Sequence, residues 1–156
     1  MSRSVEFSGT KNSGWLLIFI CWIISCISIL GSLFFSEVMF FIPCTLCWYQ
    51  RICMYPLFLL FLPAVLSYDR SVLKYSMPLS FLGWFVALYH NLVQYKIIPE
   101  SASPCSQGIS CSMSYIQWFD FITIPFLSFI AFSVLCILQI FIFLRMDSRG
   151  KALEDF

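Results

Sequence analysis

Two cysteines, Cys44 and Cys47, follow Pro43 directly and are separated by two residues. A Cys-x-x-Cys pair suits thiol–disulfide exchange, in which a thiolate attacks a disulfide and displaces a second thiolate. Proline suits the first turn of a helix, and the partial positive charge of a helix N-terminus favours a thiolate. Arg51 stands one helical turn beyond Cys47 and could hold an anion beside that sulfur. These residues predict a redox site at the start of a helix.

A second pair, Cys105 and Cys111, has five residues between its members and lies in a segment rich in serine and proline. A bridge that closes so short a loop contributes only about 2 kcal/mol in the chain-entropy model. We therefore expect a redox-active bridge, and a static loop disulfide is the alternative. With Cys44 and Cys47, the four thiols could pass electrons in series. A zinc site built from all four is disfavoured by the wide second spacing, so no metal is expected.

The other four cysteines lie inside apolar segments, where a thiol behaves as a small packing group. They are Cys21, Cys26, Cys53 and Cys136. His90 lies about five residues from the end of the third apolar segment, roughly 8 Å deep at 1.5 Å per residue. That depth matches the level expected for Cys47 and Arg51. His90 could hydrogen-bond a carbonyl of a bound cofactor, or it could satisfy a neighbouring helix.

Composition indicates an integral membrane protein. Hydrophobic residues make up 60% of the 156-residue chain and charged residues 11%, against about 25% charged residues in soluble domains. The net charge is +1 and no run of basic residues occurs, which excludes an electrostatic case for nucleic-acid binding. No glycine-rich phosphate loop is present.

The elements that must position these residues are four apolar segments within a single membrane domain, residues 1–156. We predict an all-α integral membrane protein, an antiparallel bundle of four transmembrane helices with two outward loops that carry the cysteines. The predicted helices cover about 13–36, 44–67, 75–95 and 121–144, and the outer loops cover about 37–43 and 96–120. Residues 68–74 form a short loop, and Arg145 ends the fourth helix. A charge at membrane depth is usually functional, although Arg51 could instead reach the interface as an anchor.

The distribution of Lys and Arg predicts the orientation. In a four-span arrangement seven of these residues fall on one side and two, Arg51 and Lys96, on the other. The seven are Arg3, Lys11, Arg70, Lys74, Arg145, Arg149 and Lys151. Basic residues prefer the cytoplasmic side, so both termini are expected in the cytoplasm. Both cysteine pairs then face outward, where disulfides form and persist.

The chain resembles the DsbB family of membrane disulfide-generating proteins, and most closely its BdbB/BdbC branch in Gram-positive bacteria. The resemblance spans roughly residues 15–145. It rests on Pro43-Cys44-Thr45-Leu46-Cys47 with Arg51, Tyr89-His90, Gln94, the Cys105/Cys111 pair, and Gln117-Trp118-Phe119-Asp120-Phe121-Ile122-Thr123-Ile124-Pro125. It implies a bacterial cell-membrane enzyme that takes electrons from a thioredoxin-like thiol oxidase of the DsbA or BdbD kind. The electrons would pass to a membrane quinone, either menaquinone or ubiquinone.

The resemblance also implies residue roles. The partner's thiolate would attack Cys105, Cys111 would attack Cys44, and Cys47 would remain as the thiolate that faces the quinone, steadied by Arg51. Two features depart from the family pattern. Gln50 stands where some members carry an acidic residue, and the second pair is closer in sequence than in the Gram-negative type. Two alternatives stay open: a quinone reductase resembling vitamin K epoxide reductase, and a non-catalytic four-span scaffold with structural loop disulfides.

Overall fold

The protein is a bundle of four long helices. A computed structural model describes residues 3–67, 69, 71–98 and 123–154, with side-chain surroundings for 14–67, 69, 71–98 and 123–145. The helices are α1 (Arg3–Leu33), α2 (Thr45–Ser67), α3 (Val72–Gln94) and α4 (Ile124–Glu154), and a π-helical turn, η1 (Phe34–Val38), continues α1. The described residues contain no strand.

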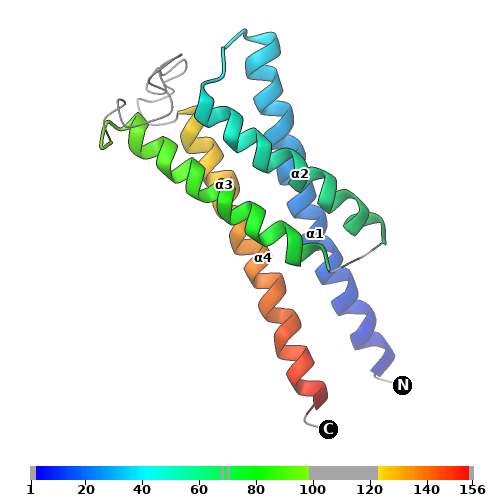
Figure 1. Ribbon diagram of the computed structural model, residues 1–156. Helices are drawn as coiled ribbons and strands as arrows, with labels where there is room; N and C mark the ends of the chain where they lie inside the picture. The colour runs from blue at the N-terminus through cyan, green and yellow to red at the C-terminus, as the bar shows by residue number, and fades with distance from the viewer. Residues whose placement is uncertain (1–2, 68, 70, 99–122, 155–156) are drawn as a thin grey trace.

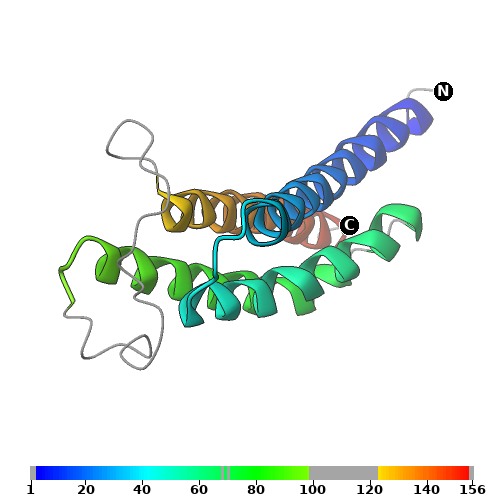
Figure 2. The same ribbon diagram turned by 90° about the horizontal axis from the view of Figure 1, so that it is seen from above.

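Successive helices run in opposite directions, so the bundle has two distinct ends. The chain termini lie at one end, and η1, the start of α2, the end of α3 and the start of α4 lie at the other (Figure 1). We call this second end the η1 end. Seen from above, α1 and α4 form one row and α2 and α3 the other (Figure 2), and each helix contacts its two neighbours in the square.

Four segments are long and apolar enough to cross a membrane. They are Gly14–Val38, Thr45–Ser67, Val72–Gln94 and Ile124–Arg145, each of 22 to 25 residues. About 20 residues at 1.5 Å per residue span a hydrocarbon core of roughly 30 Å. The prediction of an all-α membrane protein with four transmembrane helices is therefore confirmed.

Three helix ends differ from the predicted bounds. α1 begins at Arg3 rather than near residue 13, α3 begins at Val72 rather than 75, and α4 continues to Glu154 beyond Arg145. The prediction was wrong there because charged residues end an apolar run without ending a helix. Residues 146–154 contain no proline, and most of them are tolerated in a helix. The predicted loop 37–43 is shortened by η1, and the predicted loop 96–120 lies mostly outside the described residues.

The centre of the bundle is closed by aromatic packing against a glycine. Phe61 of α2 and Phe132 of α4 are fully buried in one apolar core to which all four helices contribute. The Phe132 ring lies against Gly83 of α3, so close that a β-carbon at Gly83 would overlap it. Small residues allow such close approach between membrane helices, where packing rather than burial from water drives association. Gly83 therefore fixes how α4 sits on α3.

Replacing Gly83 by alanine is expected to destabilise the folded protein. Alanine is the better helix former by about 1 kcal/mol, but its β-carbon would force the buried Phe132 ring to shift, and overpacking of this kind costs about 1–3 kcal/mol. Gly31 of α1 is a matched control, because among the described residues no atom of another helix or loop lies within 4 Å of a β-carbon placed there. Denaturant unfolding in detergent would measure both variants, and equal stability of Gly83→Ala and Gly31→Ala would contradict this account of the packing.

A buried polar contact also joins α3 to α4. The Gln139 amide nitrogen donates to Ser80 Oγ at 2.7 Å, and Ser76 Oγ lies 3.5 Å from Gln139 Oε1. All three side chains are fully buried. Hydrogen bonds of this kind hold membrane helices together because lipid offers no replacement partner. They fix the rotation of α3, the helix that carries His90.

Candidate redox site

The two cysteines of the Cys-x-x-Cys pair meet at the η1 end of α2. Cys44 directly precedes α2, and its carbonyl accepts the Trp48 amide hydrogen at 3.2 Å, so Cys44 caps the helix. Cys47 lies almost one turn further along. Their sulfur atoms are 3.1 Å apart, and both side chains border the same cavity. The pair can therefore exchange a proton or form a bond with little rearrangement.

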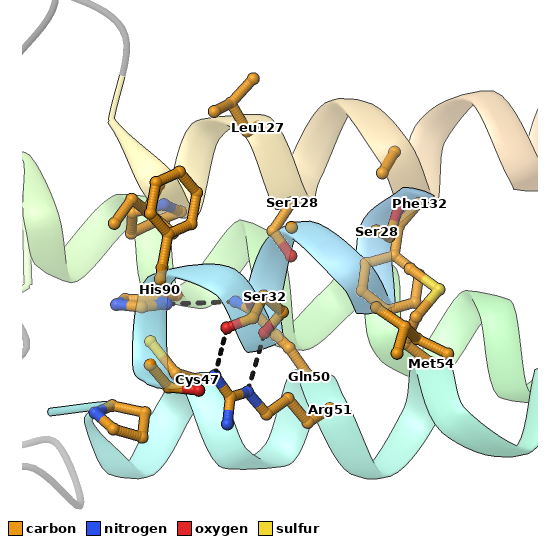
Figure 3. A pocket seen from close by; sticks show the side chains of 18 of the residues that line it. Ser28, Ser32, Cys47, Gln50, Arg51, Met54, His90, Leu127, Ser128 and Phe132 are labelled. Atoms are coloured by element: carbon orange, nitrogen blue, oxygen red, sulfur yellow. Dashed lines mark hydrogen bonds between the residues drawn. The ribbon is translucent and has the colours of Figure 1, made fainter. Parts of the chain in front are cut away.

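His90 of α3 lies beside Cys44. Its Nε2 is 3.7 Å from Cys44 Sγ, and its Nδ1 is 3.1 Å from the side-chain nitrogen of Gln50. The imidazole is only 1% exposed, and Figure 3 shows the Gln50 contact as a dashed line. The sequence placed His90 at the level of Cys47 and Arg51. It did not predict the contact with Gln50. That residue stood out in the sequence only because some family members carry an acidic residue at its position.

Arg51 is held by α1. Its Nε donates to Ser32 Oγ at 2.8 Å and its Nη2 donates to the Ser32 carbonyl at 2.7 Å (Figure 3). The guanidinium also lies 5.4 Å from the centre of the Trp48 ring, within reach of a cation–π attraction. Arg51 is 9% exposed and borders the same cavity as Cys47. This geometry differs from an anchor that extends to the interface. No sequence signal distinguished Ser32 from the other serines of α1.

A cavity of about 470 Å³ opens beside these residues. Cys44, Cys47 and His90 border it at the η1 end, and α1 and α4 supply most of its remaining wall (Figure 3). That wall is mainly apolar and includes Ile24, Ile27, Phe35, Leu127, Ile130 and Phe132. Pockets of about 300–1,000 Å³ with a few convergent polar groups are typical of small-molecule sites. The cavity therefore has the size and lining for an apolar ligand with a polar head.

Thr123 supplies a further polar group to this cavity. It is buried, and its hydroxyl has no hydrogen-bond partner among the described residues. A buried polar atom without a partner costs free energy, and a ligand that supplies the missing hydrogen bond removes that cost. In the sequence, Thr123 is only one residue of the segment before Pro125 that resembles the family, and no role was predicted for it.

In the reduced pair, Cys44 is the sulfur that carries the charge. The hydrogen bond from the Cys47 thiol is the main cause that lowers the pKa of Cys44, and with a smaller contribution from His90 and against the opposing effect of burial the pKa falls to about 4. The thiolate is the nucleophile in disulfide exchange. At neutral pH, Cys44 is therefore ready to react without a separate base.

The charge on Cys44 can be tested by titration. In reduced protein whose Cys105 and Cys111 are replaced by alanine, thiolate ultraviolet absorbance is expected to persist as the pH falls and to disappear only near pH 4. Because the pKa is depressed, the thiolate is the stable form above this midpoint and is lost below it. Cys47→Ala removes the hydrogen-bond donor and should raise the midpoint. Cys47→Ser retains a donor and should shift it less; equal midpoints in the two variants would contradict the assignment.

The remaining cysteines are distributed as the sequence suggested for packing groups. Cys21, Cys53 and Cys136 are buried within helices, and Cys26 is partly buried. None of them borders the cavity. Cys105 and Cys111 lie outside the described residues, so the predicted meeting of the two pairs stays a prediction.

The chain is similar in sequence to known disulfide formation proteins. A family model described as "Disulfide bond formation protein DsbB" matches residues 11–142. The chain is 46% identical over 122 residues to disulfide bond formation protein C of Bacillus subtilis, covering 78% of this chain and 88% of that protein. It is 44% identical over 121 residues to a probable disulfide formation protein C of Halalkalibacterium halodurans, with the same two coverages. A probable disulfide formation protein of Oceanobacillus iheyensis is 41% identical over 141 residues, or 90% of this chain and 96% of that protein. No solved structure gives a significant match.

Proposed function

Because this chain belongs to the DsbB family of disulfide bond formation proteins, in its BdbB/BdbC branch, we propose that it is a quinone-dependent thiol:disulfide oxidoreductase. Family and spans together make it a disulfide-generating, multi-pass membrane protein. Its proposed task is to reoxidise an extracytoplasmic thioredoxin-like thiol oxidase, which in turn forms disulfides in exported proteins.

The observation that carries the proposal is the position of the dithiol at one end of a largely apolar cavity between α1, α2 and α4. An electron acceptor dissolved in the lipid can reach such a cavity more readily than one dissolved in water. Thr123 and Arg51 could donate hydrogen bonds to quinone oxygens there, and the apolar wall suits a hydrocarbon tail. A bound quinone supplies a two-electron, two-proton acceptor that becomes a quinol.

Electrons would reach this dithiol through two disulfide exchanges. The partner's thiolate attacks Cys105, releases Cys111 as a thiolate, and Cys111 attacks Cys44, releasing Cys47. The partner's second thiol then resolves its bond to Cys105 and leaves oxidised. Cys105 attacks Cys111, which restores that disulfide and leaves Cys44 and Cys47 reduced. Two electrons and two protons have then moved from the partner to the Cys44–Cys47 pair.

The described residues assist particular steps. In the reduced pair the hydrogen bond from Cys47 stabilises the thiolate on Cys44. Once Cys44 is bonded to Cys111 it can no longer hold that charge. Cys47, which borders the cavity beside Arg51, would then be the thiolate that faces the acceptor. His90 lies next to Cys44 and could hold or return its proton.

The orientation of the bundle is part of the proposal. The Cys44–Cys47 pair lies at the start of α2, and this end of the bundle lies opposite the chain termini (Figure 1). The excess of Lys and Arg on the side of the termini predicts that this side is cytoplasmic. The η1 end then faces outward, into the compartment where disulfides persist.

Quinone-dependent oxidation of a partner tests this function directly. Purified protein with menaquinone or ubiquinone is expected to oxidise a reduced thioredoxin-like protein while the quinone is consumed in equal amount. No quinone reduction above background would reject the proposal. Turnover of an epoxide substrate would instead favour the reductase alternative, and partner oxidation that is unaffected by Cys47→Ser would favour a scaffold.

A further inference from the structure

Three metal-binding atoms converge at the dithiol. The sulfurs of Cys44 and Cys47 and a ring nitrogen of His90 all lie within 4.8 Å of one another. The two sulfurs are 3.1 Å apart, and Cys44 Sγ is 3.7 Å from His90 Nε2. The cysteines come from the start of α2 and the histidine from α3, so the fold rather than a local motif brings them together.

These separations are close to those of a tetrahedral zinc site. With Zn–S bonds of about 2.3 Å and Zn–N bonds of about 2.0–2.1 Å, neighbouring ligand atoms lie about 3.5–3.8 Å apart. The distance from Cys44 to His90 already falls in this range. The sulfurs must separate by roughly 0.6 Å, which a small side-chain rotation supplies. Two cysteines and one histidine leave a fourth position open, as zinc tolerates.

The charges also favour a doubly charged cation. Two thiolates and one Zn²⁺ ion sum to zero with a neutral imidazole, and a neutral group is far cheaper than separate ions in a site that is largely removed from water. Metal binding requires deprotonated thiols.

Gln50 supplies the outer contact that zinc-bound histidines usually make. Its side-chain amide lies 3.1 Å from His90 Nδ1 and is buried. The nitrogen and oxygen of an amide are interchangeable in such an assignment. With the oxygen turned toward the ring, Gln50 accepts the Nδ1 hydrogen and leaves Nε2 free to bind the metal.

We propose that the reduced Cys44–Cys47 pair and His90 bind one Zn²⁺ ion, with water or another small ligand in the fourth position. Binding transfers no electrons; it only displaces thiol protons. Disulfide formation removes both thiolates, so the oxidised protein cannot form the site. A bound ion conversely occupies both sulfurs that must be oxidised, and zinc would hold the protein in its reduced form. The proposal rests on these three side chains and does not require the quinone chemistry.

Calorimetric titration with Zn²⁺ alone, without quinone or partner, tests the site. The protein is the full chain in detergent, with Cys105 and Cys111 replaced by serine so that those thiols cannot contribute. Reduced protein is expected to bind one ion, and oxidised protein none. Cys44→Ser, Cys47→Ser and His90→Gln should each weaken binding by more than about 100-fold, because even loss of an outer partner such as Gln50 costs roughly 10–100-fold.

Cysteines outside the cluster provide matched controls. Cys53→Ser and Cys136→Ser each remove a buried helical thiol and should leave zinc affinity unchanged. Helical content is measured for every variant, so that a loss of binding through unfolding is recognised. Undiminished binding in His90→Gln would overturn the proposal. So would an absence of binding in the background without Cys105 and Cys111, since that result would point to the four-cysteine site. Either failure leaves the quinone assay unaffected.

Discussion

Replacing Cys47 by serine is expected to reduce quinone reduction to background, a loss of roughly a thousandfold or more, as for removal of a nucleophile. Serine has nearly the same size and can still donate a hydrogen bond to Cys44, so the Cys44 thiolate should remain. What serine cannot do is form the Cys44–Cys47 disulfide. The variant should therefore stop after the first exchange: the Cys105–Cys111 disulfide can still accept two electrons from the partner, but Cys44 has no disulfide for Cys111 to attack, so the reduced Cys105 and Cys111 accumulate.

Two measurements separate this outcome from a general loss of structure. Quinone consumption reports turnover, and gel analysis of trapped thiols under non-reducing conditions reports the reduced Cys105 and Cys111. Cys53→Ser is the control, because Cys53 is buried in the same helix but does not border the cavity. A Cys47→Ser protein that keeps a tenth of wild-type turnover would exclude Cys47 from the proposed electron path.

A bulky side chain on α1 that fills the cavity should cause the second largest loss of quinone reduction. Gly31 borders the cavity, and in the part of the chain that the structure describes no other element has an atom within 4 Å of a β-carbon placed there. Gly31→Trp would place an indole in the space proposed for the quinone. We expect quinone reduction to fall about 100-fold, which corresponds to about 2.7 kcal/mol at 1.36 kcal/mol per tenfold change.

The same variant should retain the chemistry that needs no quinone. Oxidised protein already holds its disulfides, so one round of partner oxidation should proceed at the wild-type rate in Gly31→Trp. Rapid-mixing assays with stoichiometric partner measure this round, and steady-state assays over a range of quinone concentrations measure turnover. Gly31→Ala should behave as wild type in both. If the tryptophan variant lost both activities, the fold would have been damaged; if it lost neither, the quinone would bind elsewhere.

The membrane architecture could be predicted from the sequence because hydrocarbon imposes a length on each apolar run. Four runs of sufficient length gave four spans, and the structure agrees. Helix ends were less predictable. The backbone beyond Arg145 stays helical to Glu154. A charged side chain ends the apolar run but leaves the backbone hydrogen bonds of the helix intact.

The local part of the site was also predictable. The proximity of the Cys44 and Cys47 sulfurs follows from helical geometry, and the rise per residue predicted that His90 lies near the level of this pair, where it contacts Cys44. Contacts between helices were not predictable, because they depend on how each helix is rotated about its axis. Arg51 could not be paired with Ser32, nor Gln50 with His90, from sequence positions 19 and 40 residues apart. The packing of the Phe132 ring against Gly83 is another contact between helices that the sequence did not predict.

The two hydrogen bonds from Arg51 to Ser32 restrict the amino acids allowed at positions 32 and 51 to different degrees. One goes to the Ser32 hydroxyl and the other to the Ser32 carbonyl, and every amino acid at position 32 carries a carbonyl. Alanine or glycine there would keep half of the arrangement. Lysine at position 51 has no planar fork to span both oxygens. Among descendants of this sequence, position 32 should tolerate exchange among small residues while position 51 remains arginine.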